Sequence, residues 1–414
     1  MESTPKSMRL QIGIFGRTNV GKSSFLNMLT GQEVAVTSPI PGTTTDVVEK
    51  VMELLPIGPV VFLDTAGFDD VTELSEKRLA KTIKVLDRVD IAILVVEPNI
   101  WTDFENQIIE KLNKKNINFF IAVNKIDEVQ PTDSFLQMLA NKVGEYVLCS
   151  STDKTNRENY INHIKSRILN IIPDDYNLNV PLLSDIISKN DVIILIVPID
   201  SQAPKGRLIL PQVQSIRDIL DNNAISVVVQ DTEYLSALKF LKEKPALVVC
   251  DSQVVHKMVA ETPADVKCTT FSILFSRFKG DLNEEVRGAA IIKKLKAGDK
   301  ILIAEACTHH PLEDDIGRIK IPRWLRNYIG GDVQIDYSTG RDFPDNLTDY
   351  KVIIHCGSCM LTRREKLMRI RKAISSDVPI TNYGITISMV QGVLERVLSP
   401  FDEALKIYRE ELNS

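Results

Sequence analysis

The sequence predicts an α/β protein with three domains, and two observations lead to this prediction. Apolar runs of strand length alternate with helical patterns along most of the 414 residues, an order typical of largely parallel sheets covered by helices. Polar stretches that contain proline interrupt this alternation at 171–181 and again at 260–266. We therefore expect one domain over 1–172, a smaller one over 181–262 and a third over 266–414.

Composition and charge limit the kinds of function that fit the chain. Hydrophobic residues make up 44 % and charged residues 25 %, as in ordinary globular proteins. The formal charge of −5 argues against a general nucleic-acid or membrane-surface binder. No apolar run is long enough to cross a bilayer, and the best one, 192–199, predicts a buried strand. The short, polar N-terminus does not resemble a signal peptide, so we expect a cytoplasmic protein whose six cysteines are thiols or metal ligands.

The segment "GRTNVGKS" at 16–23 predicts a phosphate-binding loop, because it follows a predicted strand and opens a helix. Gly16 and Gly21 allow the backbone N–H groups to face the phosphates, and the N-terminus of the helix adds a positive dipole end. We expect Lys22 to reach the β- and γ-phosphates and the Ser23 hydroxyl to bind Mg²⁺.

Two segments are expected to respond to the γ-phosphate. "DTAG" at 64–67 ends a predicted strand, where Asp64 would hold Mg²⁺ through water and the Gly67 N–H would sense the γ-phosphate. "PGTTTD" lies between this motif and the phosphate loop, and Thr44 is its expected ligand for Mg²⁺ and the γ-phosphate.

Two further segments are expected to recognise the base. "NKID" at 124–127 ends a predicted strand, and the Asp127 carboxylate suits the N–H groups of guanine, which adenine lacks. "CSS" at 149–151 is a looser match to the last base-contacting loop. The expected catalytic residues are Lys22, Thr44, Asp64 and Gly67, and the expected nucleotide contacts are Gly16, Asn19, Val20, Gly21, Lys22, Ser23, Ser24, Asn124, Lys125, Asp127, Ser150 and Ser151.

Two residues indicate the subclass of GTPase. Phe68 occupies the position where many GTPases have a glutamine that orients water, and Phe68 cannot form that hydrogen bond. With Asn19 in the phosphate loop, the pattern resembles the tRNA-modifying and ribosome-assembly GTPases, the TrmE/Era-like group activated by K⁺ and dimerisation. The resemblance implies that Asn19 helps to bind K⁺; the alternative is that Asn19 is only a turn residue.

Cysteines and histidines gather late in the chain, after two predicted strands. The nine residues 307–310 and 355–359 hold three of the six cysteines and three of the five histidines. The carboxyl ends of parallel strands face one crevice, so Cys307, Cys356 and Cys359 are expected to converge. The other three cysteines, Cys149, Cys250 and Cys268, lie on or beside apolar runs and are expected in the core.

Three kinds of site fit these residues. A Cys-x-x-Cys redox pair would not need Cys307 or the histidines, whereas a structural Cys₃His zinc site would use both. The third is an iron–sulfur cluster on three thiolates with an exchangeable fourth position. His309, His310 or His355 would act as a labile ligand or a neighbour, or an oxygen ligand would come from the acidic run Glu313, Asp314 and Asp315.

The pattern Cys307-Thr-His309 … His355-Cys356-Gly-Ser-Cys359, together with the GTPase motifs, resembles the [FeFe]-hydrogenase maturation GTPases, the HydF family. The resemblance extends over essentially the whole chain in domain order. It implies a P-loop GTPase domain, a small α/β dimerisation domain and a C-terminal α/β domain that binds a [4Fe-4S] cluster. The metal ligands would be Cys307, Cys356 and Cys359 with His309 or His355 at the cluster, and Ser23 and Thr44 at Mg²⁺.

The resemblance also implies a function. The protein would be a GTP-hydrolysing scaffold and carrier that assembles and transfers the diiron subcluster of the [FeFe]-hydrogenase active site. Its partners would be the apo-hydrogenase, the radical-SAM maturases HydE and HydG, and further copies of itself in a dimer or tetramer, with no membrane or nucleic acid. The alternative is an RNA- or ribosome-associated GTPase with a structural Cys₃His zinc site.

Overall fold

The computed structural model forms two compact units, Met1–Asn179 and Val180–Ser414. The residues that it describes are 5–31, 48–64, 85–173, 180–199, 208–306, 315–340 and 342–413.

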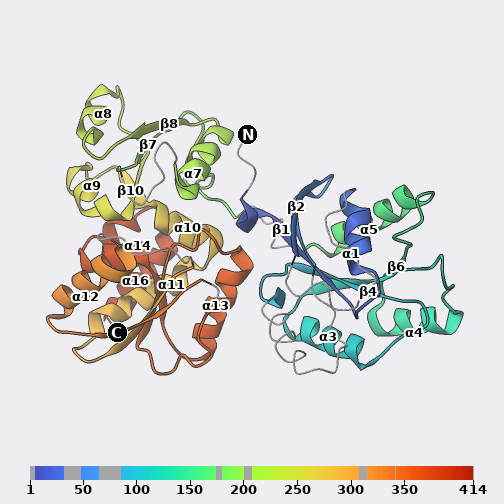
Figure 1. Cartoon of the computed structure of the whole chain (residues 1–414). Helices are drawn as coiled ribbons and strands as arrows, with labels where there is room; N and C mark the ends of the chain where they lie inside the picture. The colour runs from blue at the N-terminus through green and yellow to red at the C-terminus, as the bar shows by residue number, and fades with distance from the viewer. Residues whose placement is uncertain are drawn as a thin grey trace. The chain divides into compact units, whose positions relative to one another are not determined.

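The first unit contains a six-stranded sheet in the order β2-β3-β1-β4-β5-β6 (Figure 1). All neighbouring strands are parallel except β2, which runs antiparallel to β3. The strands are β1 (Leu10–Phe15), β2 (Val48–Leu54), β3 (Gly58–Asp64), β4 (Ile91–Val96), β5 (Asn118–Val123) and β6 (Tyr146–Leu148). Strands covered on both faces bury every side chain, which is why the sequence of β4 is apolar throughout.

Helices cover both faces of this sheet. One core holds Ile12 with Phe25 of α1 and Ile164 of α5, and the other holds Leu94 and side chains of α3 and α4. The helices are α1 (Lys22–Thr30), α3 (Asp103–Lys114), α4 (Asp133–Val143) and α5 (Arg157–Ile171), and a short 3₁₀ helix η1 (Lys6–Met8) precedes β1.

The second unit contains two four-stranded sheets, both entirely parallel. The middle sheet has the order β10-β9-β7-β8. Its elements are β7 (Val192–Ile196), α7 (Leu210–Asp221), β8 (Ile225–Val229), α8 (Tyr234–Phe240), β9 (Leu247–Cys250), η2 (Ser252–Val254), α9 (Val255–Glu261) and β10 (Lys267–Thr270). Strand β10 therefore joins the middle sheet although it follows the boundary expected at 260–266.

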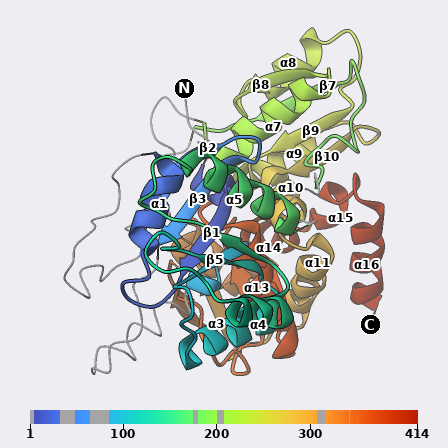
Figure 2. The same ribbon diagram turned by 90° about the vertical axis from the view of Figure 1, so that its right-hand side faces the viewer.

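The C-terminal sheet has the order β12-β11-β13-β14. Its strands are β11 (Lys300–Ala304), β12 (Gln334–Ser338), β13 (Val352–His355) and β14 (Ile380–Asn382). Around it lie α10 (Phe271–Lys279), α11 (Leu282–Ile291), η3 (Ile292–Lys294), the π-helix η4 (Ile316–Lys320), α12 (Ile321–Ile329), α13 (Arg363–Ser375), α14 (Tyr383–Val390), α15 (Leu394–Val397) and α16 (Asp402–Asn413). Figure 2 shows α16 packed along α11.

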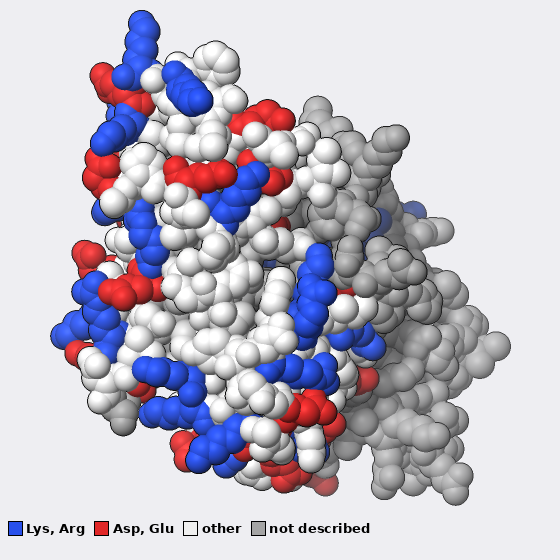
Figure 3. Space-filling model, turned by 90° about the vertical axis from the view of Figure 1, so that its left-hand side faces the viewer, with Lys and Arg blue, Asp and Glu red and all other residues white. Residues whose placement is uncertain are grey.

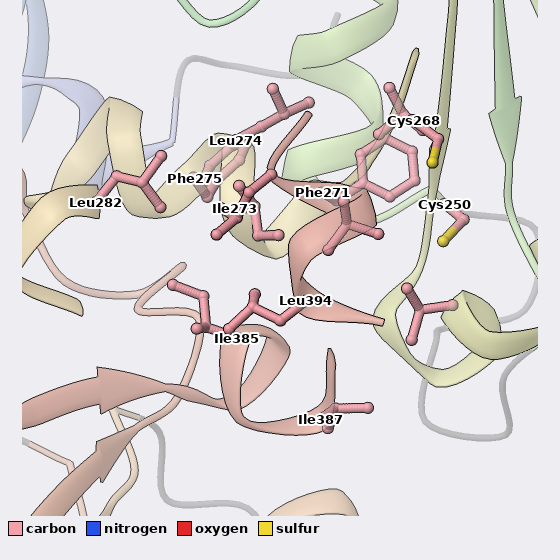
Figure 4. Close-up of a cluster of buried hydrophobic side chains, with 14 of the residues drawn as sticks. Cys250, Cys268, Phe271, Ile273, Leu274, Phe275, Leu282, Ile385, Ile387 and Leu394 are labelled. Atoms are coloured by element: carbon pink, nitrogen blue, oxygen red, sulfur yellow. The ribbon is translucent and has the colours of Figure 1, made fainter. Parts of the chain in front are cut away.

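One hydrophobic core is shared by the two sheets of the second unit. Phe271 and Ile273 of α10 and Ile385 of α14 meet there, with Cys250 and Cys268 from the middle sheet nearby (Figure 4). A smaller core under α13 fills the opposite side of the C-terminal sheet. The prediction of three α/β domains is confirmed, and Cys149, Cys250 and Cys268 are buried as expected. Among the described residues, none of the helices combines the length and apolar character that crossing a bilayer requires.

Candidate functional site

The phosphate loop connects β1 to α1 and contains several left-handed backbone positions. Gly16, Asn19 and Gly21 have φ of 154°, 66° and 88°. Glycine is required at Gly16, because a Cβ atom there would lie 2.4 Å from the carbonyl oxygen of Val95. Asparagine tolerates the left-handed conformation of residue 19 better than most residues do. The turn geometry therefore accounts for Asn19 independently of any K⁺ ion.

Lys22 begins α1, and its side chain is buried inside the loop. Its ammonium group donates hydrogen bonds to the carbonyl oxygens of Gly16 at 2.9 Å and Arg17 at 2.7 Å. The positive charge thus lies within the turn of backbone that a P-loop wraps around phosphates. Val20 is buried, and Ser24 lies in the first turn of α1.

Ser23 and Asp64 form the part of the site that suits Mg²⁺. The Ser23 hydroxyl donates to one carboxylate oxygen of Asp64 at 3.0 Å. The other oxygen of Asp64 is buried without a hydrogen-bond partner among the described residues. Burial raises the pKa of Asp64, while the Lys22 charge and the Ser23 hydrogen bond act against that shift. An unpartnered carboxylate oxygen beside a hydroxyl is the hard oxygen donor set that Mg²⁺ prefers, so these residues fit the ion.

Asn124, at the end of β5, connects the two loops expected at the nucleotide. Its side-chain amide donates to the carbonyl oxygen of Val20 at 3.0 Å. Its carbonyl oxygen accepts the backbone N–H of Ser151 at 3.0 Å and the Ser151 hydroxyl at 2.8 Å. The "CSS" segment, although a loose match in sequence, is therefore attached to the phosphate loop through one buried side chain.

Asp127 is exposed, as a group that meets a base must be. Hydrogen bonds from the buried Ser150 and from Thr152 lower the pKa of Asp127 and keep the carboxylate ionised.

Lys125, in the same motif, has a φ of 64°, and its ammonium pairs with the Glu97 carboxylate at 2.6 Å. Thr152 and Glu97 were not expected from the sequence, because neither belongs to a motif. Thr44, Gly67 and Phe68 lie outside the described residues.

A second set of candidate residues follows β13, in the segment 355–362, which we call the cysteine loop. His355 pairs in register with Ala304, the last residue of the neighbouring strand β11. The backbone N–H of Cys356 donates to the Ala304 carbonyl at 2.9 Å, and the N–H of Ala306 lies 3.0 Å from the Cys356 sulfur. The ends of β11 and β13 are therefore held together by Ala304 and Ala306, and Ala306 is the residue that precedes Cys307 in the chain.

The two cysteines of the loop differ in exposure: Cys359 is exposed, whereas Cys356 is only partly so. Burial raises the pKa of the Cys356 thiol, while backbone N–H groups of Ser358 and Ala306 act in the opposite direction. N–H donors directed at sulfur are the usual surroundings of a thiolate that ligates a metal. The sulfur atoms of Cys356 and Cys359 therefore fit a soft metal or an iron–sulfur cluster.

His355 is 1 % exposed, and both of its ring nitrogens have partners. Nδ1 lies 2.8 Å from the Cys356 carbonyl oxygen and 3.0 Å from the Ser358 hydroxyl. Nε2 lies 2.9 Å from a guanidinium nitrogen of Arg369 and must accept this bond, since arginine has only donors. Burial, and then the Arg369 charge, lower the pKa of His355 well below its usual range, so the ring is neutral. As a metal ligand His355 would first have to lose one of these partners.

The rest of the predicted metal set lies outside the described residues: Cys307, His309, His310, Glu313 and Asp314. Asp315 is buried and caps η4, where its carboxylate accepts the N–H of Arg318 at 2.7 Å. No cluster of three or more metal-binding side chains occurs within the part of the chain that the structure describes.

The second unit matches two sequence families with related descriptions. Residues 182–280 match "Hydrogen maturase F dimerization domain", and residues 283–400 match "Hydrogen maturase F tetramerization domain". Together these two segments cover more than half of the chain. The chain belongs to the HydF family.

The N-terminal segment of this HydF-family chain matches a broader family. Residues 11–125 match "50S ribosome-binding GTPase". The tRNA modification GTPase MnmE of Caldicellulosiruptor saccharolyticus is 35 % identical over 136 residues, which are 32 % of this chain and 29 % of the relative. GTPase Der of Persephonella marina is 31 % identical over 187 residues, 42 % of this chain and 40 % of the relative. The chain thus spans less than half of the length of these curated relatives.

Among solved structures, an Era variant of Aquifex aeolicus bound to GDP.AlF4- is 20 % identical, with a TM-score of 0.36. The alignment covers 56 % of this chain and 98 % of that chain. The family matches and the curated relatives together make the N-terminal unit a P-loop GTPase domain.

Proposed function

We propose that this protein is a GTP-hydrolysing scaffold and carrier that assembles the diiron subcluster of the [FeFe]-hydrogenase active site and transfers it to the apo-hydrogenase. The observation that carries the proposal is the pair of consecutive HydF domain matches, which adjoin a GTPase domain in the same chain. The cysteine loop at the end of β13 supports it, because a carrier needs a metal-binding position that partners can reach.

A [4Fe-4S] cluster would be held by Cys307, Cys356 and Cys359. The hydrogen bond from the Ala306 N–H to the Cys356 sulfur supports this assignment, and so does the exposure of Cys359. When bound, such a cluster supplies one iron with an exchangeable ligand position. His309, Glu313 and Asp314 stay candidates for that position, whereas His355 would need to release a partner first.

In the GTPase domain, Lys22 would neutralise phosphate charge, and Ser23, Thr44 and Asp64 would bind Mg²⁺ directly or through water. Asn19 would help to bind K⁺ near the β- and γ-phosphates. GTP hydrolysis would control the exchange of partners and would not be the chemistry of assembly. The partners would include the radical-SAM maturases HydE and HydG, and the protein would act in the cytoplasm without membrane or nucleic acid.

The dimerisation and tetramerisation matches indicate a homo-oligomer. For the dimer contact we propose the edge strand β8 and its neighbours. Ile225 and Val228 of β8 are 52 % and 44 % exposed, and Phe240 at the end of α8 is 86 % exposed. An exposed apolar edge strand is suited to pairing with a second copy.

The alternative is an RNA- or ribosome-associated GTPase with a Cys₃His zinc site. The match of residues 11–125 to "50S ribosome-binding GTPase" favours it. The mixed charge of the surface favours the carrier, because acidic side chains stand among the basic ones on the face in Figure 3. Nε2 of His355 accepts a hydrogen bond from Arg369, so a zinc site would have to take its histidine from His309 or His310.

The test is the metal content of anaerobically purified protein. The carrier should contain iron and sulfide and give a cluster EPR signal after reduction, and Cys356→Ser should lose most of both. Cys149→Ala, which removes a thiol from the GTPase domain, is the matched control and should keep them. Stoichiometric zinc with no cluster signal after reconstitution would replace the carrier with the alternative.

A further inference from the structure

Two buried cations hold the cysteine loop from its two ends. Lys279, the last residue of α10, is 1 % exposed, and its ammonium donates to the carbonyl oxygens of Leu361 at 3.0 Å and Cys359 at 3.4 Å. Arg369 of α13 donates to Nε2 of His355 at 2.9 Å and to the Gly340 carbonyl at 2.8 Å. Lys279 thus contacts the Cys359 end of the loop and Arg369 the Cys356 end.

The charge of Lys279 is costly to bury in this position. A buried ammonium loses its hydration, and a second ammonium lies nearby. That second group, on Lys366, is 1 % exposed and pairs with the fully buried Glu285 at 2.8 Å. Negative charge on the cysteine loop would offset this cost, because opposite charges attract strongly where water is excluded.

We infer that Lys279 and Arg369 are positioning residues that fix the cysteine loop and place one positive charge at the backbone of Cys359 and another at His355, next to Cys356. The inference rests on the proposed function, because it concerns how the chain holds the anionic thiolate cluster. A cluster on three thiolates, and the electron that reduces it, both add negative charge next to these cations. Positive charge in a buried environment stabilises the cluster-bound and reduced states most.

The loop geometry gives both residues a mechanical role as well. Ser358, between the two cysteines, has a φ of 57°, which is a strained conformation for serine. The loop then ends at Thr362, which caps α13 in a capping box with Glu365. Lys279 and Arg369 supply contacts from α10 and α13 that hold this strained turn between its two fixed ends.

The test separates charge from hydrogen bonding at Lys279. Lys279→Gln keeps a donor for the loop carbonyls but removes the charge, and Lys279→Arg keeps both. In full-length protein we expect the reduction potential of the cluster to become more negative in Lys279→Gln and to stay near the wild-type value in Lys279→Arg. Iron release to a chelator should be roughly tenfold to a hundredfold faster in Lys279→Gln, as for other residues that support metal ligands.

Arg369→Gln gives an independent second measurement and should shift the potential in the same direction. GTP hydrolysis should be unchanged in every variant. Wild-type potentials and release rates in both glutamine variants would overturn the inference while leaving the carrier proposal intact. Equal losses in Lys279→Arg and Lys279→Gln would also overturn it, because they would indicate packing and not charge. A wild-type protein that binds no cluster would instead overturn the proposed function, and this inference with it.

Discussion

Replacing Asn124 with alanine would remove the side chain that joins the phosphate loop to the loop after β6. Three hydrogen bonds with nitrogen or oxygen partners would be lost: one to the Val20 carbonyl at 3.0 Å, one from the Ser151 N–H at 3.0 Å and one from the Ser151 hydroxyl at 2.8 Å. A weaker one from the Cys149 thiol at 3.9 Å would be lost with them. Asn124 is 1 % exposed, so water cannot readily replace these bonds. We therefore expect the variant to bind GDP more weakly without losing the fold of the domain.

The size of the effect follows from the number of bonds. A neutral hydrogen bond contributes about 1 kcal/mol net, so the three together are worth about 3 kcal/mol. Since nucleotide binding requires both loops in place, that cost should appear as roughly a hundredfold loss of GDP affinity. Ser151→Ala removes only the hydroxyl bond and should cost about 1 kcal/mol, or roughly fivefold.

The assay is a fluorescence titration with a labelled GDP analogue, with circular dichroism to verify the fold. Asn113→Ala changes an exposed asparagine of α3 and serves as the control, with wild-type affinity expected. The reasoning would be refuted if folded Asn124→Ala bound GDP within twofold of wild type. It would also fail if Ser151→Ala lost as much affinity as Asn124→Ala.

Three further predictions concern the other proposed sites. Cys359→Ser should lose most of the iron and abolish hydrogenase activation while GTP hydrolysis persists; retained iron would remove this residue from the ligand set. GTP hydrolysis should be faster in KCl than in NaCl at equal ionic strength, and Asn19→Ala should abolish the difference; equal rates in the wild type would contradict K⁺ activation. Replacing Ile225 and Val228 on β8 with lysine should shift the protein toward smaller assemblies in light scattering, and an unchanged mass would exclude β8 from the interface.

The sequence predicts the fold well where elements are buried on both sides. The apolar run predicted as a buried strand at 192–199 forms β7 only over Val192–Ile196, where the last four residues are buried as in other parallel central strands; Ile199 lies beyond the strand and is 82 % exposed. Short polar strands are harder to predict: β10 is the four-residue run Lys267–Thr270, and only its pairing with β9 identifies it. The run after Pro379 divides into the three-residue β14 and α14, because the Asn382 side chain caps the helix by accepting the Ile385 N–H.

The candidate sites were predictable to the extent that they consist of local motifs. The phosphate loop and "NKID" carry their geometry in consecutive residues, so the sequence indicates them directly. The partners of the cysteine loop are different. Lys279 lies 80 residues before Cys359, and Arg369 lies 14 residues after His355. No local pattern encodes such contacts, and the sequence therefore suggested His355 as a ligand without indicating that Arg369 occupies its Nε2.

The four buried carboxylates among the described residues of the C-terminal domain all have structural partners, and this bears on what the cysteine loop can do. Glu305 pairs with Arg318 at 2.8 Å, and Glu365 takes part in the capping box of α13. Asp315 accepts the Arg318 N–H, and Glu285 pairs with Lys366. A catalyst of bond formation would need a general acid or base within reach of its reactant. Among the described residues, the loop instead has thiols, a neutral histidine and two buried cations, the features that the proposed carrier would use to hold an anionic cluster.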